Sequence, residues 1–214
     1  MRDEETGSWW QQVTGAAILG PLKGHRLRPV FHDELTFGLW KRERPQGRVL
    51  LPDAAVDQAG KYAPANWEER VTRLPVTTSK SLDGSLEPRA LVVGVTLNGV
   101  AKAYPFAVLL KQGPILDKVG GVRICVVLGD DKRSVRAYET TIDGRNHEFF
   151  VKHETSPLRL VDAETGSEWD FMGRAVAGPL AGRQLQKIAV LNDYWFDWKA
   201  YNPGTLVYEL GARN

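Results

Sequence analysis

A repeated motif constrains the fold of this chain more than any other feature of its sequence. The segment Glu5-Thr-Gly-Ser-Trp-Trp10 matches Glu164-Thr-Gly-Ser-Glu-Trp169, and Gly20-Pro-Leu-Lys-Gly24 then matches Gly178-Pro-Leu-Ala-Gly182 at nearly the same spacing. Further glycine, tryptophan and proline pairs follow at that spacing: Gly15 and Gly173, Trp40 and Trp198, Pro45 and Pro203. Matches of this kind are typical of a duplicated folding unit, so we expect a degenerate tandem repeat.

The two copies of the repeat are unequal in length. We predict a partial first repeat over residues 1–51, an irregular connection over 52–89 and a complete second repeat over 90–210, all in one compact unit. Either the first copy has lost its front half, or the chain is part of a longer protein with two full repeats. Both alternatives leave the first copy short of strand partners, which predicts an exposed edge or a homo-oligomer that supplies the missing strands.

Composition argues against several classes of partner. The formal net charge is only +2 and no run of Lys or Arg exceeds two residues, so we expect no nucleic-acid partner. The chain shows no signal peptide and no apolar run long enough to span a membrane. Cys125 is the single cysteine, which rules out an intramolecular disulfide, and its apolar neighbours predict a buried structural role.

Two short helices with aromatic faces are expected to close the two repeats. Asp33 is the predicted N-cap of a helix over 34–44, with Phe37 and Trp40 on its buried face and Leu39 as a further candidate for that face. The matching helix of the second copy covers 194–201.

Strand signals dominate the second half of the chain. Asn98-Gly99 and Asp143-Gly144 each separate two β-rich runs, and each predicts a hairpin turn. Residues 121–128 form an apolar run that predicts a buried strand, and short paired strands are expected over 5–31. We therefore predict an α+β fold that is mostly antiparallel β with short helices.

The repeated Glu-Thr-Gly-Ser-x-Trp motif has two interpretations. In a structural turn, Asp162 or Glu164 and the hydroxyls of Thr165 and Ser167 would bond to nearby backbone N–H groups, while Gly166 takes a positive φ. In a functional site, the two turns would present polar groups to a ligand between the repeats. The structural interpretation is favoured, because folding needs the turn in both copies whereas a catalytic site needs only one. The binding candidates are Glu5, Thr6, Ser8, Trp10, Arg159, Glu164, Thr165, Ser167, Trp169 and Arg174.

Familiar catalytic and metal-binding motifs are missing from the sequence. It contains no phosphate-binding glycine loop and no Gly-x-Ser-x-Gly elbow, so we assign no catalytic residue. His147 and His153 would lie roughly 20 Å apart on one extended strand, too far to share an ion unless the strand turns between them. We therefore expect both histidines to be ordinary surface residues and predict no metal site.

Further motifs accompany the repeated turn. They include Trp195-x-x-Trp198, Val92-Val-Gly-Val with Ala101-Lys-Ala-Tyr-Pro105, and Asp117-Lys-Val-Gly-Gly121. With the turn motif, they resemble the bacterial and archaeal family known as domain of unknown function 3179. The resemblance implies a protein that is often longer and exported or lipid-anchored, and it implies no established activity. Members often carry a Cys-Pro-Leu-Cys-like stretch, which a chain with Cys125 alone cannot provide.

Two hypotheses about function follow. The first is a non-catalytic binding or structural module of the cell envelope, with an unidentified small ligand or protein partner. The resemblance implies an extracytoplasmic location. The alternative is an enzyme of unknown class that uses the polar residues of the two turns, with Arg159 or Arg174 orienting an anion. It requires these side chains to converge on one pocket, and the sequence assigns no cofactor to either hypothesis.

Overall fold

The computed structural model describes residues 1–28, 30–77 and 82–210, and the chain divides into two compact units, Met1–Asp33 and Glu34–Asn214. In the described residues, no helix is both long and apolar enough to cross a membrane. The boundary between the units falls inside the segment 1–51 that the sequence analysis assigned to the first repeat.

The first unit is a small antiparallel ribbon. Strand β1 (Trp9–Trp10) pairs with β2 (Ala17–Leu19), with an irregularity in register between Trp9 and Trp10. Two isolated bridges extend the ribbon, Arg2 with Trp9 and Ala16 with Arg26. Ser8, Trp10 and Ala17 supply its buried side chains.

The second unit contains three four-stranded sheets and a two-stranded ribbon among its described residues. The first sheet has the order β15 (Leu191–Tyr194), β3 (Leu91–Leu97), β4 (Val100–Pro105), β16 (Leu206–Val207). The second has the order β14 (Lys187–Ile188), β7 (Val135–Glu139), β6 (Val122–Leu128), β5 (Ile115–Val119). The third has the order β10 (Phe149–Val151), β11 (Arg159–Asp162), β12 (Glu168–Asp170), β13 (Ala175–Ala177). The ribbon pairs β8 (Thr141–Ile142) with β9 (Arg145–Asn146).

Short helices complete the second unit: α1 (Phe37–Glu43), α2 (Ala54–Gln58), α3 (Trp67–Arg73), α4 (Phe106–Leu109) and α5 (Trp195–Tyr201). The paired strands run antiparallel, apart from the parallel pair of β16 with β4. The predicted α+β class, mostly antiparallel with short helices, is therefore confirmed.

The second unit is layered, and β6 lies at its centre because both faces of this strand are buried. Ile124 and Val126 pack in one hydrophobic cluster with the β3–β4 sheet. Cys125 and Val127 pack in another cluster with Trp169 and its sheet. This two-sided burial explains the unbroken apolar run of the strand, since alternation is expected only when one face meets water.

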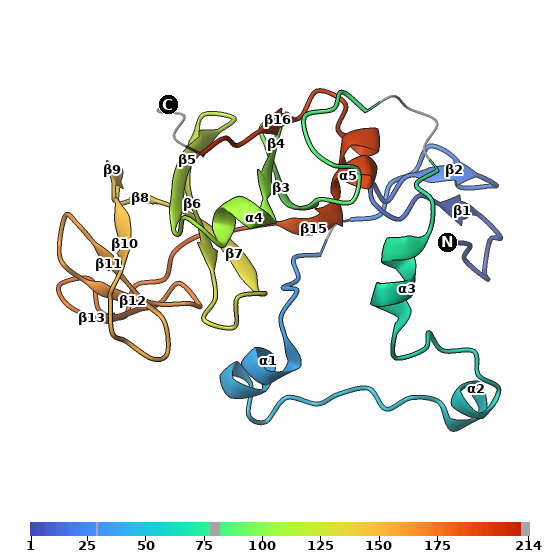
Figure 1. The fold of residues 1–214 in the computed structure, drawn as a ribbon, viewed down its shortest axis with the longest axis horizontal. Helices are drawn as coiled ribbons and strands as arrows, with labels where there is room; N and C mark the ends of the chain where they lie inside the picture. The colour runs from blue at the N-terminus through green and yellow to red at the C-terminus, as the bar shows by residue number, and fades with distance from the viewer. Residues whose placement is uncertain (29, 78–81, 211–214) are drawn as a thin grey trace. The chain divides into compact units, whose positions relative to one another are not determined.

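Helix α5 covers the outer face of the β3–β4 sheet. Trp195 and Trp198 pack there against Val92 and Ala103. Gly94 lets the helix approach, because a Cβ atom at this position would lie 2.2 Å from the Trp198 ring. Figure 1 shows the resulting order across the second unit: α5, the β3–β4 sheet, the β6–β7 sheet and then the β10–β13 sheet.

Local turn signals are confirmed. Leu97 pairs with Val100 across the Asn98-Gly99 turn, where both central residues have positive φ angles of 48° and 78°. The Asp143-Gly144 turn joins β8 to β9, but the following strand β10 pairs with β11 rather than continuing that hairpin. Cys125 is fully buried, as predicted, and burial raises the pKa of its thiol to about 12.

The helix expected over 34–44 is shorter than predicted, and of its predicted buried face Leu39 is buried, Trp40 is half-buried and Phe37 is exposed. It begins at Phe37, because the Thr36 hydroxyl accepts the Leu39 N–H and acts as the N-cap in place of Asp33. Leu39 is the buried residue of this helix, at 3% exposure, whereas Phe37 is 65% exposed and stacks on Trp40. Leu39 is buried because it packs in the cluster of Trp169, a contact that helix periodicity alone does not specify.

The two buried tryptophans provide a test of the layered core. Trp169→Ala and Trp198→Ala should each lower the free energy of unfolding by about 3–5 kcal/mol, because each leaves a large cavity. Both side chains are nearly inaccessible, at 0% and 3% exposure. Urea denaturation measures the loss. Trp67→Ala is the control, since Trp67 is 49% exposed. If either core variant melted like the Trp67 variant, that tryptophan would not lie in the core.

Asp193 provides a pH-dependent test of the region next to α5. Burial, followed by the negative charges of Asp197 and Glu34, raises the pKa of Asp193 to about 6. The ordinary value of an aspartate in an unfolded chain is about 3.9, so folding takes up a proton and stability rises as the pH falls from about 7 to about 4. Asp193→Asn removes the buried charge and keeps an oxygen that can accept the Tyr194 N–H.

We therefore expect Asp193→Asn to stabilise the protein at pH 7 by about 1 kcal/mol, after allowance for partial solvent screening. The gain should vanish at about pH 3, below both pKa values, where the wild-type carboxyl is largely protonated in the folded and in the unfolded state. Urea denaturation at the two pH values checks this. An equal effect of the substitution at both would contradict the assigned shift.

Candidate functional site

The carboxylate of Asp162 is the centre of the repeated turn in the second unit. It accepts the backbone N–H of Thr165 at 2.7 Å, the Thr165 hydroxyl at 2.8 Å and the Trp169 indole N–H at 2.9 Å. Gly166 has a φ of 69°, as predicted for this turn. Asp162 and Trp169 are both fully buried, so this network lies inside the protein.

A second layer of hydrogen bonds connects this turn to the Gly-Pro-Leu segment. The single Thr165 hydroxyl proton goes to Asp162, so in the 2.6 Å pair of hydroxyls Ser167 must be the donor. The Ser167 oxygen in turn accepts the N–H of Leu180 at 3.0 Å. Gly178 allows this contact, because a Cβ there would lie 2.6 Å from the Ser167 backbone and its φ is 87°.

The turn of the first unit has the same hydrogen bonds around Asp3. Its carboxylate accepts the Thr6 N–H at 2.6 Å and the Trp10 indole N–H at 2.7 Å. Ser8 bonds to the Thr6 hydroxyl and accepts the N–H of Leu22. The hydrogen bond from Trp10, then that from the Thr6 backbone, lowers the pKa of Asp3 to about 2.

Asp162 remains ionised for the same reason. Burial would raise the pKa of this carboxyl, but hydrogen bonds from Trp169 and Thr165 together outweigh burial and hold the pKa below its ordinary value. The turn therefore contains a buried carboxylate with a full negative charge.

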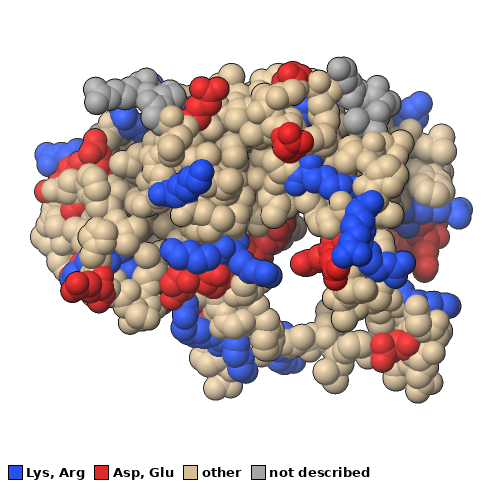
Figure 2. Space-filling model, in the orientation of Figure 1, with Lys and Arg blue, Asp and Glu red and all other residues tan. Residues whose placement is uncertain are grey.

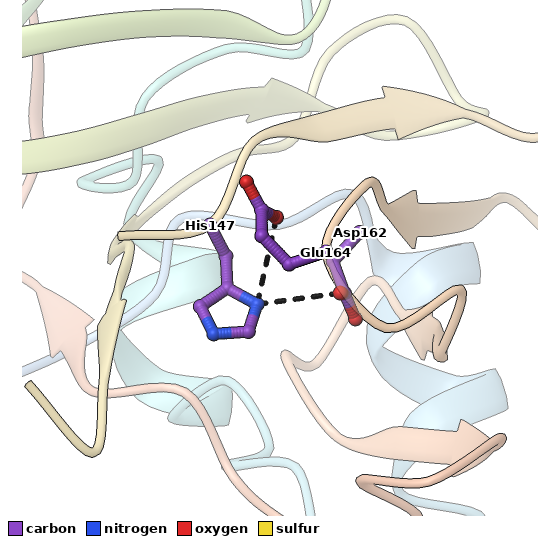
Figure 3. Close-up of side chains that lie close together, drawn as sticks. All are labelled: His147, Asp162 and Glu164. Carbon is purple, nitrogen blue, oxygen red and sulfur yellow. Dashed lines mark hydrogen bonds and ion pairs between the residues drawn. The ribbon is translucent and has the colours of Figure 1, made fainter. Parts of the chain in front are cut away.

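His147 makes the second turn different from the first. Its Nδ1 atom lies 3.2 Å from an Asp162 oxygen and 3.6 Å from a Glu164 oxygen, as Figure 3 shows. His147 is only 6% exposed, so the expectation that it is a surface residue was wrong. The backbone N–H of His147 is held by the carbonyl of Thr140, which places the side chain beside the turn.

The carboxylates fix the tautomer of the imidazole. A neutral ring has one N–H, and two carboxylate oxygens face Nδ1, so that nitrogen holds the proton. Nε2 has no hydrogen-bond partner within the described part of the chain and is not shut off from solvent. It is therefore free to accept a proton or a hydrogen bond from a ligand.

His147 and Glu164 line a pocket with a volume of about 1080 Å³. Other charged groups around it are Asp117 and Lys118 of β5, Arg123 of β6, and Glu148. Asp117 forms a buried ion pair with Lys102 at 2.7 Å and accepts a hydrogen bond from Tyr104. The pocket thus has a basic wall on β5–β6 and an acidic wall that includes Glu148 and Glu164.

The structure brings together some of the predicted site residues and separates others. Of the predicted candidates, only Glu164 lines the large pocket. The side chains of Ser8, Ser167, Trp10 and Trp169 are buried in the turns, with exposures of 8% or less.

Two predicted arginines lie together elsewhere. Arg159 and Arg174 line a smaller pocket of about 220 Å³, where Arg174 pairs with Asp170 at 2.9 Å. Glu5, the counterpart of Glu164, is exposed and makes no hydrogen bond through its side chain to any described residue. Thr6 and Thr165 both direct their hydroxyls to the turn aspartates.

Charge is mixed over the surface that Figure 2 shows. Lysine and arginine side chains lie beside aspartate and glutamate side chains over much of this view.

Fold and turn together define a β-rich α+β protein with an aspartate-centred turn beside a polar pocket. The chain belongs to the family described as "Protein of unknown function (DUF3179)", whose profile matches residues 1–205. This match confirms the resemblance drawn from the motifs. Comparison with curated proteins and with solved structures finds no match to either.

The substitution Asp162→Asn tests the structural role of the buried carboxylate. One carboxylate oxygen accepts a backbone N–H and the other an indole N–H, so either orientation of an amide places its NH₂ group against a donor. We expect a loss of about 2–3 kcal/mol in the free energy of unfolding. Glu164→Gln is the control and should cost little, because its amide oxygen still accepts the Glu148 N–H. Equal losses for the two variants would contradict the assignment.

Proposed function

We propose that this protein is a binding module that takes a small anionic ligand in the pocket beside the second turn. The supporting observation is a pair of like charges. Lys118 and Arg123 are directly opposite each other on β5 and β6, and both line the pocket. Neither has an ionic partner among the described residues.

Two facing cations on neighbouring strands repel each other unless an anion lies between them. A ligand with a carboxylate or phosphate group would relieve this repulsion and form charge-assisted hydrogen bonds with both side chains. His147 Nε2 and the hydroxyl of Tyr208, which also lines the pocket, offer further polar contacts. These features favour a small polar ligand over an apolar one.

The cell envelope is part of the same proposal and rests on the family resemblance alone. Fractionation of the source cells tests it, and recovery of the protein in the cytosol would contradict it.

An enzyme remains the alternative, now supported by a different residue. The hydroxyls of Thr165 and Ser167 are engaged within the turn. His147, with Nδ1 held by a carboxylate and Nε2 open to the pocket, has the arrangement of a general base. If the wild-type protein converts a bound ligand chemically and the His147→Gln variant does not, the enzyme is favoured over a binding module.

Thermal shift measurements with inorganic phosphate, citrate and a neutral sugar test the binding proposal. An anion at about one hundred times its dissociation constant should stabilise the fold by about 2.7 kcal/mol. The neutral sugar should give no shift. The variant Lys118→Gln/Arg123→Gln should bind the anion at least about tenfold more weakly, since each lost contact is charge-assisted.

The matched control is Lys132→Gln/Arg133→Gln, which removes the same charge from the loop between β6 and β7, outside the pocket lining. An equal loss of anion binding in both double variants would mean that net charge, rather than this pocket, binds the anion. The proposal would then be wrong.

A further inference from the structure

We propose that His147, Asp162 and Glu164 bind a divalent transition-metal ion such as Zn²⁺ in the acidic wall of this pocket. The ion would lie in the same pocket as the proposed anion, but the inference rests on a separate set of atoms and does not require that an anion bind. It assigns a function to His147, which no sequence motif connects to Asp162 and Glu164 of the turn.

The donor atoms already have the spacing of a metal site. One donor atom from each residue lies within 4.8 Å of the other two. The distances from His147 Nδ1 are 3.2 Å to Asp162 and 3.6 Å to Glu164. Ligands of a tetrahedral Zn²⁺ lie roughly 2.0–2.2 Å from the ion and therefore roughly 3.3–3.6 Å from each other. The two distances from His147 already match this spacing, and the third, between the carboxylates of Asp162 and Glu164 drawn in Figure 3, is no more than 4.8 Å.

The first unit provides an internal comparison. Its turn has the same hydrogen bonds around Asp3 with no histidine described beside it. The turn of the first unit therefore forms around Asp3 without the histidine contact that Asp162 makes in the second unit. His147 and the orientation of Glu164 are additions to the second turn that folding of the motif does not require.

Charge balance also favours a cation. Asp162 is fully buried, and the only basic side chain paired with it or with Glu164 among the described residues is His147. A divalent ion would place positive charge next to the buried carboxylate of Asp162 and the exposed carboxylate of Glu164, and a buried charge such as that of Asp162 is otherwise costly.

Outer contacts hold the donors in place. The Trp169 indole and Thr165 fix the Asp162 carboxylate, and the Glu148 N–H holds Glu164 at 3.0 Å. Partners of this kind orient the ligands in known metal sites. The three protein donors leave a fourth position for water or for a ligand, as in zinc sites that remain open.

Metal binding requires a change of tautomer. The proton on Nδ1 must leave before that nitrogen can coordinate the ion. The neutral ring then has its single proton on Nε2 instead of Nδ1. Metal binding thus changes the ring from the Nδ1–H to the Nε2–H tautomer. This reversal gives a spectroscopic signature that depends on His147 itself.

Isothermal titration of the full-length, metal-depleted protein with Zn²⁺ tests the inference. We expect one site of defined stoichiometry, weakened at least about tenfold in Glu164→Gln and by more in His147→Gln. Glu5→Gln is the matched control, because it makes the same change in the first turn and should leave the affinity unchanged. His25, His32 and His153 remain in every variant, so adventitious binding at these histidines would not differ among them.

NMR of the ¹⁵N-labelled imidazoles should show His147 changing from the Nδ1–H to the Nε2–H form as Zn²⁺ is added. The inference is overturned if Glu164→Gln and Glu5→Gln bind Zn²⁺ alike, or if the His147 ring is unaffected by the metal. Anion binding measured in the presence of EDTA separates the two proposals. If the protein binds the anion but not Zn²⁺, only the metal site is contradicted. If it binds Zn²⁺ but not the anion, only the anion site is contradicted.

Discussion

The arrangement of the turn depends on one buried carboxylate that receives several hydrogen bonds at once. Asp162 accepts from a backbone amide, a hydroxyl and an indole, and it thereby fixes the turn, the strand β12 and the position of Trp169. An ionised group in the interior is tolerated only when its lone pairs are satisfied in this way. Asp3 meets the same requirement in the first unit with the same kinds of donor.

The same carboxylate also connects structure to function. Among the described residues, Asp3 of the first unit has no histidine partner, whereas Asp162 of the second unit contacts His147, which lines a polar pocket. A turn that is needed for folding thus becomes one side of a candidate binding site through residues outside the motif. The basic wall, Lys118 and Arg123, comes from another sheet, so the pocket depends on how the layers pack.

Much of the fold could be predicted from local patterns. The positive φ of Gly166, the Asn98-Gly99 hairpin and the buried Cys125 each follow from a short stretch of sequence. Predictions that depended on distant contacts were less successful. Phe37, predicted on the buried face of its helix, is exposed, whereas Leu39 of the same predicted face packs in the Trp169 cluster. His147, predicted at the surface, is buried beside Asp162, which follows it by 15 residues. Near the turn, the sequence feature that pointed to this contact was Asp162 at the start of the turn, and it did not identify His147 as the partner.

The protonation of His147 in the metal-free protein tests the central arrangement most directly. Long-range ¹H–¹⁵N correlation of labelled protein, assigned with His147→Gln, reports which ring nitrogen has the proton at a pH where the ring is neutral. If Asp162 and Glu164 hold the ring as described, Nδ1 is protonated and Nε2 is not. A ring protonated at Nε2, with Nδ1 free, would contradict the arrangement and remove the basis for the site.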